Sequence, residues 1–160
     1  MIAGYPRTLT VVAADGAGVS GGVFFAFSTF VMKALGQLPD AEAVTAMNAI
    51  NKAAPTPLFM LALFGTGAVS IALSVVAFRH LDQNWAPYVL IGSVLYLVCV
   101  VVTVAYHVPQ NDALALVDPR SPDAARAWAQ YLSPWTAWNH VRTVTALTGA
   151  TAFILGLRAA

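Results

Sequence analysis

The side chains that could take part in chemistry are concentrated in a few short polar segments of this chain. One of them, "SPWTAWNHVRTV" at residues 133–144, contains Trp138, Asn139, His140 and Arg142. An imidazole can transfer a proton or bind a metal, amides and guanidinium groups donate hydrogen bonds, and an indole can stack on an aromatic ligand. The segment therefore has the side-chain types of a ligand-binding or substrate-binding pocket.

The spacing of these residues predicts which of them share one face of a helix. Ser133 and Pro134 match an N-cap and a first helical position, so we expect a helix to begin there. At about 100° per residue, Asn139 and Arg142 fall on one stripe and His140 lies almost opposite. The stripe also contains Trp135, Trp138, Ala146, Gly149 and Phe153. We expect the stripe to face the protein interior and His140 to face a neighbouring helix or the lipid headgroups.

A second row of polar side chains follows the apolar segment 86–106 and ends just beyond it. Tyr96 and His107 share one helical face with Gly92, Cys99, Thr103 and Gln110. Polar groups inside a membrane usually line a cavity or pair across helices. His107 is therefore a candidate for ligand or substrate contact, while Tyr96 either lines the pocket or forms an interhelical hydrogen bond.

The composition indicates that these groups belong to a membrane protein. Of the 160 residues, 59% are hydrophobic and 9% are charged, and the mean hydropathy is +0.71. Soluble proteins contain roughly 25% charged residues, and a soluble domain of this size could not bury so much apolar surface. A net charge of +1 provides no basic surface for nucleic acid. The lone Cys99 excludes a disulfide framework and a cysteine zinc site.

Four apolar stretches are long enough to cross a bilayer, which takes about 20 helical residues. They occupy approximately residues 8–34, 57–78, 86–106 and 141–157. Helical spacing of apolar residues also predicts a short interfacial helix between the first two stretches, and a second one is expected between the last two. The predicted fold class is all-α: a single integral membrane domain, residues 1–160, forming an up-down-up-down four-helix bundle with two short interfacial helices in its loops.

This topology brings most of the polar side chains to one end of the bundle. The first span ends there, the second begins, the third ends and the fourth begins. Besides the segment 133–144, the polar residues expected at that end are Asn48, Asn51, Lys52, Tyr106, His107, Gln110, Asn111 and Asp112. The sequence therefore predicts a pocket at this membrane face, built from several helix ends.

The distribution of basic residues predicts the orientation. The end that carries both termini has Arg7, Arg79 and Arg158 in very short segments, while the other end has more basic residues spread over longer loops. By density of positive charge, both termini are expected in the cytoplasm of a bacterium, with the bundle in its plasma membrane.

The first span has a face of small residues that a second helix could approach closely. Ala14, Gly18, Gly22 and Ala26 recur at every fourth position. Small residues at this spacing let helix backbones pack together in membranes. We expect this face to pack against another helix, and Gly18 and Gly22 could also form a homo-oligomer contact.

Four blocks follow one another along most of the chain. They are "GVFFAFSTFVMKAL" (22–35), "AMNAINKAAPTPLF" (46–59), "VPQNDALA" (108–115) and "WTAWNHVRTVTAL" (135–147). In this order they resemble the anthrone-oxygenase-like family of small four-helix membrane proteins. The resemblance transfers Asn111 of the third block, and Trp138, Asn139, His140 and Arg142 of the fourth, as site positions.

The resemblance implies a cofactor-independent oxygenase that oxidises a small hydrophobic aromatic substrate, anthrone-like or phenol-like, with O2. An activated carbon of such a substrate must lose a proton before the resulting anion reacts with oxygen. Neutral His107 or Asp112 could accept the proton, Arg142 and asparagine amides could stabilise the oxyanion, and Trp138 could stack on the rings. The catalytic candidates are Asn139, Arg142, His107, His140 and Asp112, and the substrate-binding candidates are Trp138, Asn111, Asn51, Tyr106 and Tyr96.

Two other classes of function stay open at this point. His107 and His140 could bind a haem or, with Asp112, a copper or iron ion, although no His-x-x-x-His or Glu-x-x-His spacing is present. Alternatively, the chain is a non-enzymatic small membrane subunit that packs through the glycine face of its first span.

Overall fold

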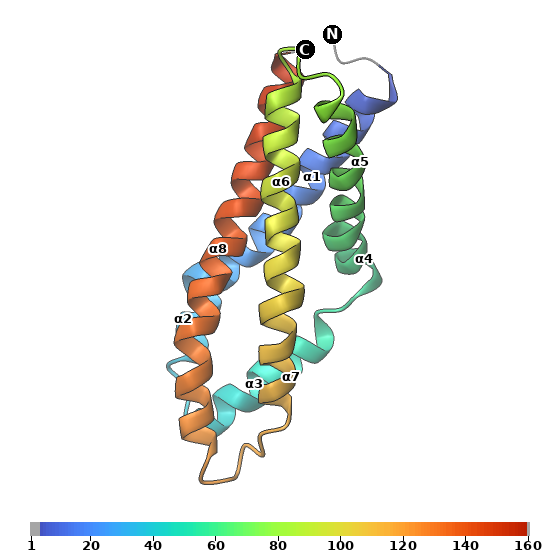
Figure 1. The fold of residues 1–160 in the computed structure, drawn as a ribbon. Coiled ribbons are helices and arrows are strands. Elements are labelled where there is room, and N and C mark those ends of the chain that lie inside the picture. The colour runs from blue at the N-terminus through green and yellow to red at the C-terminus, as the bar shows by residue number, and fades with distance from the viewer. Residues whose placement is uncertain (1–3, 160) are drawn as a thin grey trace.

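The computed structural model describes residues 4–159, and this part of the chain is helical with no strand. Four long helical rods lie side by side, and a shorter helix crosses one end of them (Figure 1). The first rod begins at the same end of the bundle at which the last rod finishes (Figure 1). The all-α class is therefore confirmed, and the rods alternate in direction as expected.

Three of the four rods consist of helical segments that follow one another without a break. The first rod is α1 (Tyr5–Ala26), the π-helical turn η1 (Phe27–Val31) and α2 (Met32–Leu35). The second rod is α4 (Pro57–Met60), η2 (Leu61–Gly65) and α5 (Thr66–Phe78). The third rod is α6 (Ala86–Val102), η3 (Thr103–His107) and α7 (Val108–Ala115). The fourth rod is α8 (Ala124–Arg158), and the crossing helix is α3 (Asp40–Ala53).

The structure corrects the number of helices and the ends of two of them. Residues 4–159 form five helices, the four rods and α3, where we expected four spans with two short interfacial helices. The second short helix is not a separate element, because residues 124–134 are the first turns of α8. The third rod also continues through α7 to Ala115 instead of ending near residue 106.

The expected start of the last helix at Ser133 and Pro134 is wrong, since Pro134 lies inside α8. A proline in a helix interior removes one backbone hydrogen bond and costs about 3 kcal/mol. The helix continues across it because Trp128 and Tyr131 before the proline, and Trp135 after it, are buried in one hydrophobic cluster. Burial of these aromatic side chains on both sides outweighs the local stop signal.

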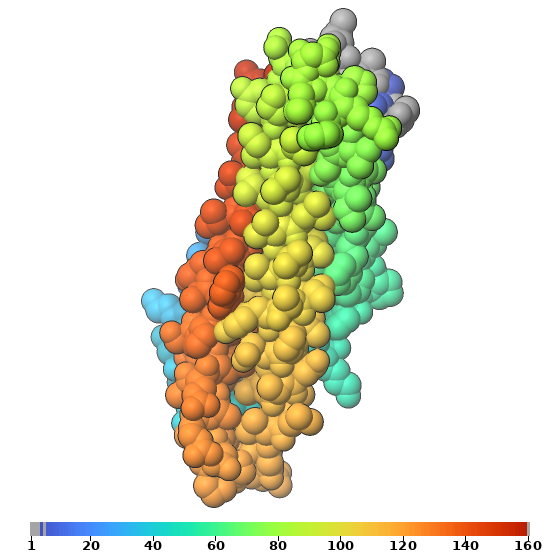
Figure 2. Space-filling view, in the orientation of Figure 1, coloured from blue at the N-terminus to red at the C-terminus, as the bar shows by residue number. Residues whose placement is uncertain are grey.

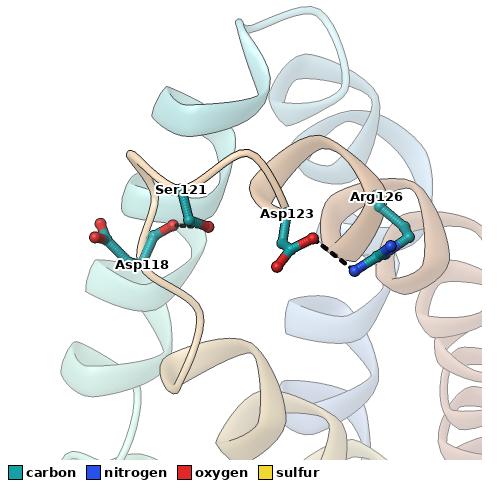
Figure 3. Close-up of polar contacts among 4 residues, drawn as sticks. All are labelled: Asp118, Ser121, Asp123 and Arg126. Carbon is teal, nitrogen blue, oxygen red and sulfur yellow. Dashed lines mark hydrogen bonds and ion pairs between the residues drawn. The ribbon is translucent and has the colours of Figure 1, made fainter.

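Local hydrogen bonds close the loop between α7 and α8. The Ser121 hydroxyl donates to the carbonyl oxygen of Asp118 at 2.8 Å. At the start of α8, the guanidinium of Arg126 and the carboxylate of Asp123 form an exposed ion pair at 2.6 Å (Figure 3). Such exposed pairs contribute about 0–1 kcal/mol, so the loop geometry depends mainly on its short length and on the helices it joins.

The third and fourth rods approach each other closely at two glycines, Gly92 and Gly149. A Cβ atom on Gly92 of α6 would lie 3.0 Å from the carbonyl oxygen of Gly149 and 2.9 Å from the ring of Phe153. A larger residue at either glycine would push the two backbones apart. The two glycines therefore set the separation of α6 and α8. The third rod and α8 carry many of the polar residues at the end of the bundle that α3 crosses.

The first rod packs through a face that overlaps only partly with the one expected. Ala13, Ala17 and Gly21 are buried against the bundle. Gly18 and Gly22 face outward, since a Cβ atom on either would meet no atom within 4 Å. Of the expected row, Ala14 is buried in the core, whereas Gly18 and Gly22 face open space among residues 4–159, so a homo-oligomer contact at the two glycines stays a prediction.

Three helices are long and apolar enough to cross a membrane: Pro6–Leu35, Pro57–Phe78 and Ala86–Ala115. The predicted fourth span, within α8, is not among them, and α8 contains Arg142 as well as several threonines. Exposed apolar side chains such as Val19, Ile71 and Val101 cover the outer surface of the bundle. The chain is therefore an integral membrane protein by helix length and composition.

The rods are longer than a bilayer core. The 35 residues of α8 span about 52 Å at about 1.5 Å per residue, whereas the hydrocarbon core is about 30 Å thick. Figure 2 shows this elongated shape, with α6 and α8 running along the visible face. The polar end of the bundle, with α3 and the start of α8, therefore extends beyond the span of one hydrocarbon core.

The close contact between α6 and α8 predicts that Gly92→Ala destabilises the protein by about 1–3 kcal/mol, because the added methyl group overpacks a site bounded by backbone. Thermal or denaturant unfolding of the detergent-solubilised protein, followed by circular dichroism, measures the change. Gly18→Ala is the matched control and should be neutral or slightly stabilising, because its methyl group meets open space. Equal effects of the two substitutions would contradict the assigned contact.

Candidate functional site

A partly open cavity of about 190 Å³ lies toward the end of the bundle that α3 crosses. Its walls come from all four rods and from the end of α3, and most of them are apolar. The polar and aromatic residues that line it include Phe24 and Phe27 of the first rod, Asn51 of α3, Thr103, His107 and Asn111 of the third rod, and Trp135 and Arg142 of α8. The predicted pocket built from several helix ends is therefore present as a cavity.

Arg142 is the dominant charge in this cavity. Its side chain is only 6% exposed. Within residues 4–159, the one ion pair joins Asp123 and Arg126, so Arg142 has no acidic partner in the described part of the chain. One terminal nitrogen of Arg142 donates to Oδ1 of Asn139 at 2.7 Å, while Nε makes no hydrogen bond. The cavity therefore contains a desolvated positive charge that is only partly satisfied by the protein.

Asn139 holds Arg142 in place from behind. It is fully buried and does not line the cavity. Its Nδ2 donates to the carbonyl oxygen of Phe24 and to Oγ of Ser28, both at 2.8 Å. The Ser28 hydroxyl is also 2.9 Å from Oγ1 of Thr143. Asn139 thus connects α8 to the first rod and presents its own oxygen to the guanidinium.

Two aromatic rings fix the guanidinium from the side. The Cζ atom of Arg142 lies 4.2 Å from the centroid of the Phe24 ring and 5.2 Å from that of Trp135. Cation–π contacts contribute about 0.5–2 kcal/mol, depending on desolvation. They orient Arg142 without neutralising its charge, so the charge remains available to a ligand.

The π-helical turns lie where the cavity and its supporting hydrogen bonds form. The carbonyl that Asn139 uses, at Phe24, lies just before η1, and η3 contains the lining residues Thr103 and His107. The hydroxyl of Tyr96 approaches the carbonyl of Leu63 in η2 at 3.2 Å. A π-helical turn changes the backbone hydrogen-bond register and is frequent at functional sites. Nothing in the sequence analysis indicated these turns.

His107 is buried in the cavity wall and is 1% exposed. Its Nδ1 lies 3.3 Å from the carbonyl oxygen of Val102, and its Nε2 lies 3.3 Å from that of Trp135. A neutral imidazole can donate to only one of these carbonyls, and its other nitrogen carries a lone pair. His107 can therefore act as a proton acceptor once that nitrogen turns from the carbonyl toward a ligand.

Asn111 is held in one orientation by two aromatic donors. Its Oδ1 accepts hydrogen bonds from the hydroxyl of Tyr131 at 2.7 Å and from Nε1 of Trp135 at 2.9 Å. Burial raises the pKa of Tyr131, so its hydroxyl stays protonated and can donate. Because the oxygen of Asn111 is occupied, only its amide nitrogen is available to a ligand in the cavity.

Asn51 reaches the cavity from α3. Its Nδ2 is buried and has no hydrogen-bond partner. Asn51 and Asn111 also line an outer groove of about 470 Å³ beside Lys52 and Asp112. The groove and the cavity share wall residues, so they adjoin at the gap between α3 and α7.

Two predicted aromatic contacts lie outside the cavity. Trp138 is 44% exposed and packs on Tyr106 with a centroid separation of 5.2 Å. Neither residue lines the cavity. The tryptophan at the cavity is Trp135, which lies at the centre of the predicted helical stripe, whereas Trp138 lies at its edge.

Three further predicted residues are also separated from the cavity. His140 is exposed and lines a different groove with Lys33. Asp112 is exposed on the outer groove beside α3. Tyr96 is fully buried deeper in the bundle, where its hydroxyl lies 2.9 Å from Oγ of Ser20. The structure thus brings together His107, Asn111, Asn51 and Arg142, with Asn139 behind them.

The described residues do not converge on a metal. Among residues 4–159, no group of three or more His, Cys, Asp or Glu side chains could hold a metal ion. His107 and His140 line different cavities. In this structure the two histidines therefore do not face one common cavity.

The fold and the site define a helical membrane protein with an apolar, arginine-containing cavity at one end. The chain matches the anthrone oxygenase family over residues 45–152, which is more than half of its length, and it belongs to that family. The resemblance to this family is therefore confirmed, and three of the four sequence blocks lie inside the matched region. The matched region includes Asn51, His107, Asn111 and Arg142, but not the first rod. No curated protein and no solved structure matches the chain.

The bridging position of Asn139 predicts that Asn139→Ala lowers the free energy of unfolding by about 1–3 kcal/mol, since it removes the hydrogen bond that Asn139 donates to the Phe24 carbonyl and the one it accepts from the Arg142 guanidinium. Denaturant unfolding in detergent measures this loss. His140→Ala, one residue away and exposed, should change stability by less than about 0.5 kcal/mol. A stable Asn139→Ala protein would show that the bridge between α8 and the first rod is dispensable.

Proposed function

We propose that this protein is an oxygenase that oxidises an activated aromatic substrate, of anthrone or phenol type, with O2 in the cavity around Arg142. The observation that carries the proposal is the buried guanidinium without an acidic partner in an otherwise apolar, aromatic-walled cavity. Such a charge favours a ligand that is, or becomes, an anion during the reaction. Membership of the anthrone oxygenase family supports the oxygenase class.

The overall reaction on an anthrone-type substrate converts a ring CH2 group to a carbonyl. The substrate carbon loses two hydrogens and four electrons, O2 gains the four electrons, one oxygen atom enters the product and the other leaves as water. The first step is loss of a proton from the CH2 group, which moves negative charge onto the existing carbonyl oxygen. Stabilising that oxyanion is the task best matched to Arg142.

Arg142 and the amide nitrogen of Asn111 are the proposed oxyanion donors, and Asn139 positions Arg142. A preorganised donor of this kind typically contributes about 2.7–4 kcal/mol to the transition state. Trp135, Phe24 and Phe27 supply aromatic surface for the substrate rings. The apolar walls also suit O2, which is itself apolar.

His107 is the proposed proton acceptor, because it is the neutral base among the residues that line the cavity. Protonated His107 could donate to the carbonyls of both Val102 and Trp135, which already lie 3.3 Å from its nitrogens. Asp112, the other predicted acceptor, is exposed on the outer groove and would need a relay to reach the substrate.

The cavity is small for a tricyclic substrate. Pockets for drug-sized ligands usually enclose about 300–1,000 Å³, against about 190 Å³ here. Since the wall formed by Asn51 and Pro55 also borders the outer groove, movement of the end of α3 would enlarge the cavity in that direction. We therefore propose that the substrate enters between α3 and α7.

The reaction as proposed requires no added cofactor, in keeping with the chemistry of some family members. A haem or a copper or iron site that used both His107 and His140 would require the two residues to face one group, and they line separate cavities. In a purely structural membrane subunit, the unpaired charge of Arg142 would have no function.

Arg142→Met should lower the turnover number for an anthrone by about 10²–10³-fold, because it removes the charge that stabilises the oxyanion. Oxygen uptake by the protein in lipid nanodiscs measures the rate, with product formation checked by absorbance. Arg158→Met is the matched control on the same helix, since Arg158 is exposed at the far end. Undiminished oxygen uptake by a folded Arg142→Met protein would contradict the proposed site.

His107→Gln should slow proton removal by about 10²–10⁴-fold, because glutamine keeps polar contacts but cannot accept the proton. The CH2-deuterated substrate should then show a larger kinetic isotope effect with the variant than with the unchanged protein. An unaltered rate and isotope effect would assign proton removal to another group.

A further inference from the structure

Two nitrogen donors in the cavity are buried without a hydrogen-bond partner. They are Nε of Arg142 and Nδ2 of Asn51. Within residues 4–159, no other buried side-chain nitrogen lacks a hydrogen-bond partner. Arg142 and Asn51 line the same cavity. A buried donor without a partner destabilises the protein, and more so when it is charged. Two such donors in one cavity indicate that a ligand atom completes their hydrogen bonds.

The charges around the cavity define what that ligand atom must be. No aspartate or glutamate lines the cavity, and His107 is the one other titratable residue on its walls. Asn139 satisfies one terminal nitrogen of Arg142 but brings no negative charge. The aromatic contacts from Phe24 and Trp135 likewise leave the charge uncompensated. The missing partner is therefore an anionic oxygen and not a neutral hydroxyl.

We propose that this cavity binds one aromatic oxyanion, an aryl carboxylate or phenolate, whose oxygen bridges Arg142 of α8 and Asn51 of α3. The ring of this ligand lies against the apolar walls that include Phe24 and Phe59, which meet edge to face at 6.3 Å. The site discriminates between an anion and a neutral molecule of the same shape, because only the anion compensates the guanidinium.

The bridge also explains why a helix outside the four rods contributes to the site. α3 is anchored to the bundle mainly through Val44 and Met47, in a hydrophobic cluster separate from the core of the rods. Asn51 lies one helical turn further along and reaches the cavity without a partner. The oxyanion supplies a polar contact between Asn51 at the end of α3 and Arg142 of α8.

This inference rests on the cavity assigned under the proposed function, but it does not depend on turnover. The site selects this class of ligand on binding, before any reaction takes place. Binding can be measured without O2 and without an oxidisable substrate, so the two proposals can fail separately.

The probes are benzoate and benzamide, which have nearly the same shape and differ in charge. Purified protein in nanodiscs of zwitterionic phosphatidylcholine is titrated with each under nitrogen, by calorimetry and ligand-detected NMR. Benzoate should bind at one site per chain and at least about 10-fold more tightly than benzamide, as expected for hydrogen bonds to a charged group. Equal affinity for the two probes, or no saturable binding of benzoate, would overturn the proposal.

Two variants locate the binding. Arg142→Gln should reduce the affinity for benzoate to that for benzamide, and Asn51→Leu should reduce the benzoate affinity by about 10-fold while leaving benzamide binding almost unchanged. Asn84→Leu is the matched control, because Asn84 is exposed in the turn at the opposite end of the bundle. Since Asn51 is near the end of α3 and outside the rods, its variant tests the site even if Arg142→Gln does not fold.

The outcomes separate the two proposals. Charge-selective binding that depends on Asn51 and Arg142, together with no oxygen uptake on any anthrone, supports the oxyanion site and contradicts the oxygenase. Oxygen uptake with no preference for benzoate supports the oxygenase and overturns the oxyanion site. Benzoate binding that is unchanged in Asn51→Leu would also overturn the bridge between α3 and α8.

Discussion

A guanidinium inside an apolar helix bundle has lost its water, and the loss costs several kcal/mol unless the protein or a ligand replaces those interactions. The surroundings of Arg142 follow from this requirement. Asn139 accepts one hydrogen bond from it, and the rings of Phe24 and Trp135 cover its faces. Without these contacts the side chain would turn toward solvent, and the cavity would lose the positive charge proposed to bind an anionic ligand.

The backbone of the rods is adapted to the same requirement. Asn139 can hold Arg142 only because the carbonyl of Phe24 and the hydroxyl of Ser28 accept from its amide group. Phe24 lies just before the π-helical turn η1 and Ser28 lies within it, and His107 occupies the last position of another π-helical turn, η3. Irregular backbone at membrane depth is tolerated where it faces protein or a cavity, because its polar groups find partners there. The glycine contact of Gly92 and Gly149 then keeps the third rod and α8 at the separation this network needs.

Sequence periodicity predicted part of the site correctly and failed at identifiable points. The helical spacing places Asn139 and Arg142 inward and His140 outward, and the structure agrees on all three. Trp138 was favoured over Trp135 as the stacking residue, but only Trp135 lines the cavity. A stripe about 100° wide contains both tryptophans, and which one is covered depends on where the neighbouring rods lie, not on the sequence of α8 alone.

The sequence by itself determined the membrane class, the helical fold, the bounds of the second rod, the family and the end of the bundle where polar residues meet. These depend on hydropathy, on local helical spacing and on alternation of direction, all of which can be counted along the chain. Only the tertiary structure decided that α8 continues through Pro134, that the first rod packs through Ala17 and Gly21 instead of Gly18 and Gly22, and that Asn51 meets Arg142 in one cavity. Each of these depends on burial against residues distant in sequence, whose contribution exceeds the local cost of a proline or the local signal of a small-residue row.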